Sequence, residues 1–183
     1  NQPGRTRCAT LDLGGFNLLV GSDEAGLFQG DPFGDNFWYP LGDELGHGVH
    51  VMAYGVVPPA TQAGVRLPAG GGGALEGLVQ RMPVGTDQGR LDFSDDYGTT
   101  WSPAFVPLVS TDEVRRLARD GNFANLVYAL VHGNDGSSNG WYVLRSWDCG
   151  GTYEVLNGDS VSERPDLWVE RGPVSRLHYI EGT

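Results

Sequence analysis

Alternation of apolar and polar residues over short segments is the main structural signal in this chain. Residues 89–93 (GRLDF) and 141–145 (WYVLR) have strand length, and further strand-like runs lie at residues 5–11, 166–170 and 176–180. Such runs, separated by Gly, Pro, Asn and Asp, are typical of antiparallel strands. The pattern therefore predicts an all-β fold.

One segment has helical spacing instead. Residues 110–113 (STDE) have the form of a capping box, and apolar residues follow at Val114 and Leu117. This combination is typical of a helix start. We therefore expect one short helix near residues 111–119. Its arginines are expected on a solvated face rather than in a binding cluster: Arg115, Arg116 and Arg119.

A short motif occurs twice, each time directly after a strand-like run. Residues 94–101 (SDDYGTTW) and 146–153 (SWDCGGTY) share the pattern S-x-D-x-G-x-T-[WY], and a degenerate third copy covers residues 30–38. Ser and Asp side chains that accept backbone N–H groups, with a Gly at positive φ, build a tight turn between antiparallel strands. We therefore expect a structural role for the motif residues, which are Ser94, Asp96, Gly98, Thr100, Trp101, Ser146, Asp148, Gly150, Thr152 and Tyr153.

The motif resembles the Asp box, or bacterial neuraminidase repeat, of a β-propeller family that includes sialidases, xyloglucanase-type glycosidases and sortilin-type receptors. The resemblance covers roughly residues 16–41, 78–106 and 125–157. It implies boxes on outer hairpins, away from the ligand face. It also implies a single domain over residues 1–183, folded as a small or partial propeller of about four blades of ordinary length.

Closure of such a propeller needs a partner for its terminal strands, because open sheet edges invite aggregation. Residues 5–11 are strand-like, and so are residues 166–170 and 176–180 near the C-terminus. We therefore expect the N-terminal run to pair with the C-terminal strands, within the chain or with those of a neighbour.

Composition excludes several classes of function. The net charge of −11 argues against a nucleic-acid partner, because phosphate neutralisation needs a basic face. No apolar run approaches the 18 residues of a membrane span. All twelve basic residues are Arg, so the chain has no lysine for a P-loop or a Schiff base. Cys8 and Cys149 either form a single bridge or remain two free thiols.

Candidate chemical groups give weak signals. The resemblance to sialidases implies an arginine triad and a Tyr/Glu nucleophile pair, and neither can be placed in this sequence. His47 and His50 lie three apart on a non-helical segment, which does not favour a zinc site, and residues 134–140 suit a solvated hairpin loop better than a calcium site. Trp147 occupies a variable position of a box turn, so it is the candidate ligand-binding residue, by stacking on a sugar or a protein. The alternative is that its ring packs on the next hairpin.

Two functions remain open. The first is a non-enzymatic binding or assembly module, extracellular or part of a virion as a decoration, fibre or tail-tip protein. It would be a homo-oligomer that binds protein partners or a surface glycan and needs no cofactor. The alternative is a glycoside hydrolase of the sialidase or xyloglucanase type, or a fragment of one. Scaffold and site are separable, so the fold alone does not choose between them.

Overall fold

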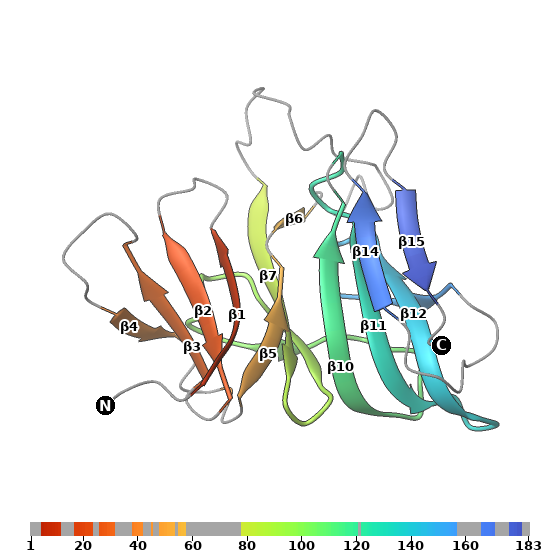
Figure 1. Cartoon of the computed structure of the whole chain (residues 1–183). Helices are drawn as coiled ribbons and strands as arrows, with labels where there is room; N and C mark the ends of the chain where they lie inside the picture. The colour runs from red at the N-terminus through yellow and green to blue at the C-terminus, as the bar shows by residue number, and fades with distance from the viewer. Residues whose placement is uncertain are drawn as a thin grey trace.

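The computed structural model of the chain is all-β, as the alternating pattern predicts (Figure 1). It describes residues 5–11, 17–23, 26–31, 38–41, 45, 48–53, 55–57, 78–120, 122–156, 166–170 and 176–180. Within these residues no α-helix is present, and each pair of neighbouring strands is antiparallel.

The strands form three larger sheets and one hairpin. The first sheet has the order β1 (Thr6–Leu11), β2 (Leu18–Ser22), β3 (Gly26–Gly30), β4 (Trp38–Leu41). The second has the order β5 (Val49–Met52), β7 (Val79–Thr86), β8 (Leu91–Ser94), β9 (Ser102–Pro103), with β6 (Gly55–Val57) also paired to β7. The third has the order β10 (Ser110–Arg119), β11 (Val127–Asn134), β12 (Asn139–Ser146), β13 (Glu154–Val155). The C-terminal hairpin joins β14 (Asp166–Glu170) and β15 (Arg176–Ile180).

The three sheets repeat one arrangement. β5 and β6 pair with opposite ends of the same side of β7, so together they act as one interrupted edge strand. Each larger sheet therefore consists of four successive antiparallel strand positions, and the chain passes from each sheet to the next in sequence order. The runs at residues 166–170 and 176–180 are strands, as predicted, and they pair with each other to form the C-terminal hairpin.

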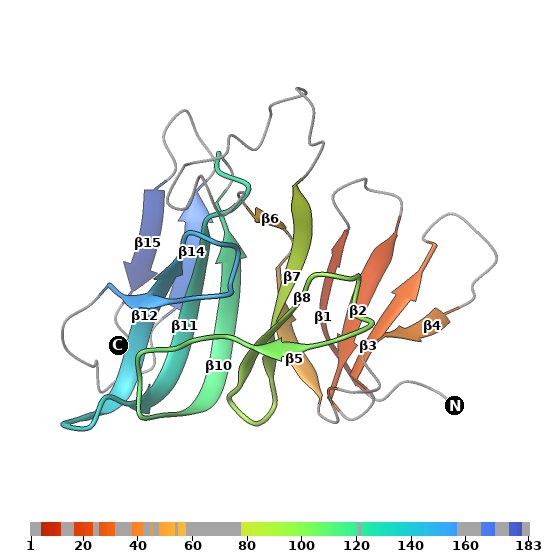
Figure 2. The same ribbon diagram turned by 180° about the vertical axis from the view of Figure 1, so that it is seen from behind.

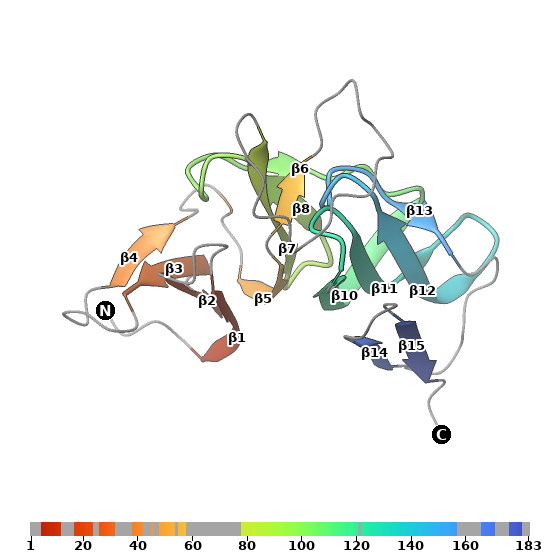
Figure 3. The same ribbon diagram turned by 90° about the horizontal axis from the view of Figure 1, so that it is seen from above.

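The sheets lie face to face, and their first strands share one side of the molecule (Figure 3). β5 contacts both β1 and β10. On the opposite side, the chain after β8 runs from the second sheet across to the third (Figure 2). There Phe105 N donates to Gly151 O, and Tyr153 N donates to Phe105 O, both at 2.9 Å.

Two apolar cores separate the three sheets. The core between the first and second sheets includes Leu27 and Val84, both without exposed surface. The core between the second and third sheets includes Leu91, Val131 and Tyr142. Val84 and Leu91 lie on opposite faces of the second sheet, because their cross-strand partners Asp92 and Gly85 are adjacent positions in the β7–β8 register. The second sheet is therefore buried on both faces.

The helix predicted near residues 111–119 is wrong, because the segment is strand β10. The register with β11 shifts twice, between Thr111 and Glu113 and between Val114 and Arg116. Each shift is a β-bulge, which inserts one unpaired residue. The second bulge brings Val114 and Leu117 to the same buried face at a spacing of three, which a helix would also give.

The predicted pairing of residues 5–11 with this chain's own C-terminal strands is also wrong. β1 pairs with β2, from Thr6 opposite Ser22 to Leu11 opposite Leu18. β14 pairs with β15 and contacts β10. Few residues separate β1 from β2 in the sequence, so β1 pairs locally with β2. Pairing of residues 5–11 with strands of a neighbouring molecule stays a prediction.

The two cysteines do not form a disulfide. Cys8 Sγ donates to Val49 O in the first core, and Cys149 Sγ donates to Arg81 O in the second. Burial raises the pKa of each thiol to about 12. Both side chains therefore act as small apolar core groups.

We expect both thiols to be protected in the native protein. Alkylation by iodoacetamide, which needs the thiolate, should be much slower in buffer than in guanidinium. Since the folded state favours the protonated thiols, their contribution to stability is complete below about pH 9 and is lost as pH rises towards about 12. Equal labelling rates in native and denatured protein, measured by mass spectrometry, would contradict this account.

Candidate functional site

The two Asp-box turns have the same hydrogen bonds. In the first, Ser94 Oγ accepts Gly98 N at 2.7 Å and donates to Asp96 Oδ1 at 2.8 Å. Asp96 Oδ1 also accepts Thr100 N at 2.8 Å, and its Oδ2 accepts Thr100 Oγ1 at 2.6 Å. These bonds, those of Thr100 first, lower the pKa of Asp96. Gly98 has φ of 84°, so this position requires the conformational freedom of glycine.

The second turn repeats this network residue by residue. Ser146 Oγ accepts Gly150 N at 2.7 Å and donates to Asp148 Oδ1 at 2.7 Å. Asp148 then accepts Thr152 N at 2.9 Å and Thr152 Oγ1 at 3.0 Å. The two turns occupy equivalent places, because the first joins β8 to β9 and the second joins β12 to β13. Each box thus links the third and fourth strands of its sheet.

The aromatic residues that close the boxes pack differently. Trp101 Nε1 donates to Gly98 O at 3.1 Å, and its ring packs against the first core. Tyr153 is buried in the second core, and among the described residues its hydroxyl group has no hydrogen-bond partner. Burial raises the pKa of Tyr153. The degenerate copy falls in the connection between β3 and β4, where residues 32–37 lie outside the described part of the chain.

Arg81 of β7 joins the two boxes. Its guanidinium makes a bidentate pair with Asp95, with Nε–Oδ1 at 2.6 Å and Nη2–Oδ2 at 2.7 Å. Its Nη1 donates to the backbone carbonyl of Asp148 at 3.1 Å, and the group lies 4.0 Å from the ring centroid of Phe93. Burial by itself lowers the pKa of Arg81, but the hydrogen bond and charge of Asp95 outweigh it and the pKa is raised. Sequence reasoning missed this residue, because nothing local to residue 81 marks it.

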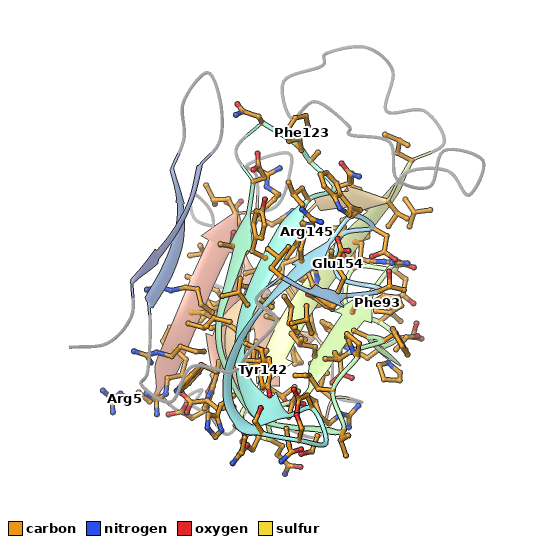
Figure 4. All side chains as sticks on the ribbon, turned by 90° about the vertical axis from the view of Figure 1, so that its right-hand side faces the viewer. Arg5, Phe93, Phe123, Tyr142, Arg145 and Glu154 are labelled. Atoms are coloured by element: carbon orange, nitrogen blue, oxygen red, sulfur yellow. The ribbon has the colours of Figure 1, made fainter. Side chains whose placement is uncertain are left out.

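Trp147 is half-buried rather than fully exposed. Its ring lies 5.2 Å from the guanidinium of Arg145, and its carbonyl accepts Asn125 Nδ2 at 2.6 Å. Arg145 in turn pairs with Glu154 at 2.7 Å, on the part of the third sheet that faces the viewer in Figure 4. The aromatic ring therefore already has a cationic partner, which reduces the face available for a ligand.

A groove lies at the other side of the sheets, where their first strands meet. It has a volume of about 480 Å³. Its lining comes from β1, β5 and β10, and the residues are Arg7, Cys8, Ala9, His50, Val51, Met52, Glu113, Val114, Arg115, Arg116 and Leu117. The volume is within the range of small-molecule sites.

The charges in this groove oppose those of the whole chain. The lining contains three guanidinium groups, of Arg7, Arg115 and Arg116, and the carboxylate of Glu113, and a second carboxylate, of Asp23, pairs with Arg7 at the rim. The guanidinium groups therefore still outnumber the carboxylates, whereas the chain carries a net charge of −11. The bulge in β10 leaves Arg115 without a cross-strand partner and exposed. The sequence pattern assigned Arg115 and Arg116 to a solvated helix face, so the error in secondary structure also hid this cluster.

Polar contacts of Asp23 link residues of the first sheet to each other and to His50 of the second sheet at the rim of the groove. Asp23, in the turn after β2, accepts a hydrogen bond from Arg7 Nε and lies 3.1 Å from His50 Nε2. The hydrogen bond from Arg7 lowers the pKa of Asp23. Gly48 touches the backbone of Asp23 so closely that a Cβ atom would overlap the carbonyl of Asp23. These contacts hold Arg7 of β1 and His50 of β5 on the same side of the groove.

The other segments that the sequence suggested as metal sites gain no set of metal ligands within the described residues. His47 lies outside the described residues, and within them no three His, Cys, Asp or Glu side chains gather as metal ligands. Residues 134–140 span the end of β11, the hairpin loop at residues 135–138 and the start of β12. In the loop, Asp135 accepts hydrogen bonds from the backbone N–H groups of Ser137 and Ser138, which lower its pKa to about 2. Within the described part of the chain there is no helix long and apolar enough to cross a bilayer.

Comparison with known proteins gives no family assignment. No protein-family model matches the sequence, and no curated protein matches it. The Asp-box resemblance thus rests on the sequence motif alone.

Removal of either box carboxylate should destabilise the fold. Asp96→Ala and Asp148→Ala each remove an acceptor of a backbone N–H and a hydroxyl group, which costs about 1–2 kcal/mol of unfolding free energy. The matched control is Asp87→Ala, in the exposed β7–β8 turn, which should change stability by less than about 0.5 kcal/mol. Urea denaturation measures all three. Box variants as stable as the control would refute the structural role.

A double-mutant cycle should detect coupling between Arg81 and Asp95, which lies in the first box. Arg81→Met and Asp95→Asn together should show a coupling energy of about 1–2 kcal/mol, since the pair is bidentate and Arg81 is only 12% exposed. Arg145→Met with Glu154→Gln is the comparison pair, more exposed and expected to couple by less than about 0.5 kcal/mol. Equal coupling in the two cycles would argue against a special role of Arg81.

Proposed function

We propose that this chain is a non-enzymatic binding module built as a partial β-propeller, and that the groove between β1, β5 and β10 binds an acidic carbohydrate. The observation that carries the proposal is the gathering of Arg7, Arg115 and Arg116 around one groove in an acidic chain. Guanidinium groups pair with carboxylates through charge-assisted, directional hydrogen bonds. The groove volume suits one or two sugar units rather than a protein surface.

The propeller assignment is supported by the repeated order of the three sheets. The boxes connect third and fourth strands, on the side away from the first strands and the groove. This is the relation between box hairpins and ligand face that the Asp-box resemblance implies. We propose an extracellular or virion location for this chain, because a surface glycan is the ligand proposed for it.

A glycoside hydrolase is the weaker proposal. Hydrolysis with retention or inversion uses two carboxyl groups about 5–9.5 Å apart across the substrate. Among the described residues that line the groove, Glu113 is the carboxylate, and the positive side chains outnumber it. This composition favours holding an anion over cleaving a glycosidic bond.

Titration calorimetry with sialylated, uronic-acid and neutral oligosaccharides tests the proposal. We expect binding of an acidic sugar that weakens with added salt, and no binding of the neutral sugars. Arg115→Ser should weaken binding roughly tenfold to a hundredfold, because one charge-assisted pair is lost. Since Arg115 is exposed on a bulge, the variant should fold like the wild type.

Arg145→Ser is the matched control, because Arg145 lies beside Trp147 on the outer part of the third sheet. Binding lost in Arg145→Ser but kept in Arg115→Ser would move the site to Trp147. Binding of neutral sugars alone would refute an acidic ligand. Turnover of sialosides or β-glucans above a heat-killed sample would favour the hydrolase.

A further inference from the structure

The far face of the first sheet, turned away from the second sheet, is apolar across all four strands. Two cross-strand rows define it. The first row is Ala9, Val20, Phe28 and Pro40, and the second is Leu11, Leu18, Gly30 and Trp38. The ring of Trp38 lies over Gly30, where a Cβ atom would approach it to 2.8 Å. We call these eight residues the open face.

The opposite face of the same sheet is the one that packs in the core. Leu19 and Leu27 alternate with the open-face residues along β2 and β3, and both are buried against Val49 and Val84 of the second sheet. By contrast, the open face remains in contact with solvent, since Leu11 is 50% and Trp38 46% exposed. A contiguous apolar surface of this kind marks an interaction site.

The rest of the molecule indicates what covers a face of this kind. The corresponding face of the second sheet is covered by the first sheet, and that of the third sheet by the second. In each case the cover is the sheet that comes one step earlier in the stack. The last unit of the stack is the C-terminal hairpin, which lies beside the third sheet and contacts β10 (Figures 1 and 3).

Continuing the stack by one step would place a C-terminal hairpin on the open face. The hairpin of the same chain does not reach it, because the hairpin and the first sheet lie at opposite sides of the molecule in Figures 1 and 3. We propose that the open face is covered by the C-terminal hairpin of a second copy of this chain, and that the second copy's open face receives the first copy's hairpin. The two contacts are related by a twofold axis.

Such a pair closes the stack into a ring. Each copy contributes three larger sheets and one hairpin, so the ring contains eight units, which is within the four to eight blades typical of propellers. Closure by a twofold axis also prevents the open-ended growth that head-to-tail contacts otherwise produce. The inference rests on the stacking of the sheets and does not depend on the ligand of the groove.

Light scattering after size-exclusion chromatography, over a series of concentrations, tests the inference. The wild-type chain should have twice the 19.7 kDa mass of one copy. The double variant Leu11→Asp with Trp38→Asp should have the mass of one copy, with a dissociation constant raised at least about a hundredfold, because two charges would be buried without partners. Both positions are about half exposed, and far-UV circular dichroism checks that the variant folds.

Tyr39→Asp is the control, since Tyr39 is next to Trp38 but on the other face and 65% exposed. It should keep the mass of two copies. The single variant Leu11→Asp decides the question if the double variant fails to fold, and it too should lower the mass. A wild-type mass of one copy at all concentrations would overturn the inference, as would a pair that the open-face variants leave intact. A mass that keeps growing with concentration would overturn the closed ring.

Discussion

Burial of both faces of the second sheet is the constraint on which the rest of the structure depends. Val84 fills one face and Leu91 the other, so the first and third sheets are held on either side at a fixed distance. This places β5 between β1 and β10. The groove exists because three first strands, from sheets far apart in sequence, are brought to one side by this packing.

The box turns support this stack from the opposite side. In each turn the Ser and Asp side chains accept hydrogen bonds from backbone N–H groups of the same turn. These N–H groups therefore need no partner from another part of the chain. Arg81 then ties the first turn to the second through Asp95 and the carbonyl of Asp148. The desolvation of this largely buried guanidinium is offset because both oxygens of a carboxylate and a backbone carbonyl accept hydrogen bonds from it. The boxes thereby contribute to the spacing between sheets as well as to each hairpin.

Strand β10 connects the fold to the proposed function. A regular strand would alternate Val114 and Arg115 and would turn Leu117 away from the core. The bulge after Val114 keeps Leu117 buried while Arg115 and Arg116 are both exposed beside the groove. Two neighbouring arginines therefore serve one site without removing an apolar residue from the core. The same bulge makes the segment look helical in sequence.

The sequence by itself determined the strands and the two box turns. These depend on local features: alternation predicted strands in residues 89–93, 166–170 and 176–180, and the Ser, Asp and Gly positions predicted the turns. The corresponding strands cover residues 91–94, 166–170 and 176–180. Four features were decided only by the tertiary structure. They are the strand conformation of residues 110–119, the pairing of β1 with β2, the contacts of Arg81 and the presence of the groove. Each of these depends on contacts between residues distant in the chain, such as Val114 with Val131 or Arg7 with Asp23. Local patterns carry no information on such pairings, because a bulge or a change of partner alters which residues meet without altering the sequence around them.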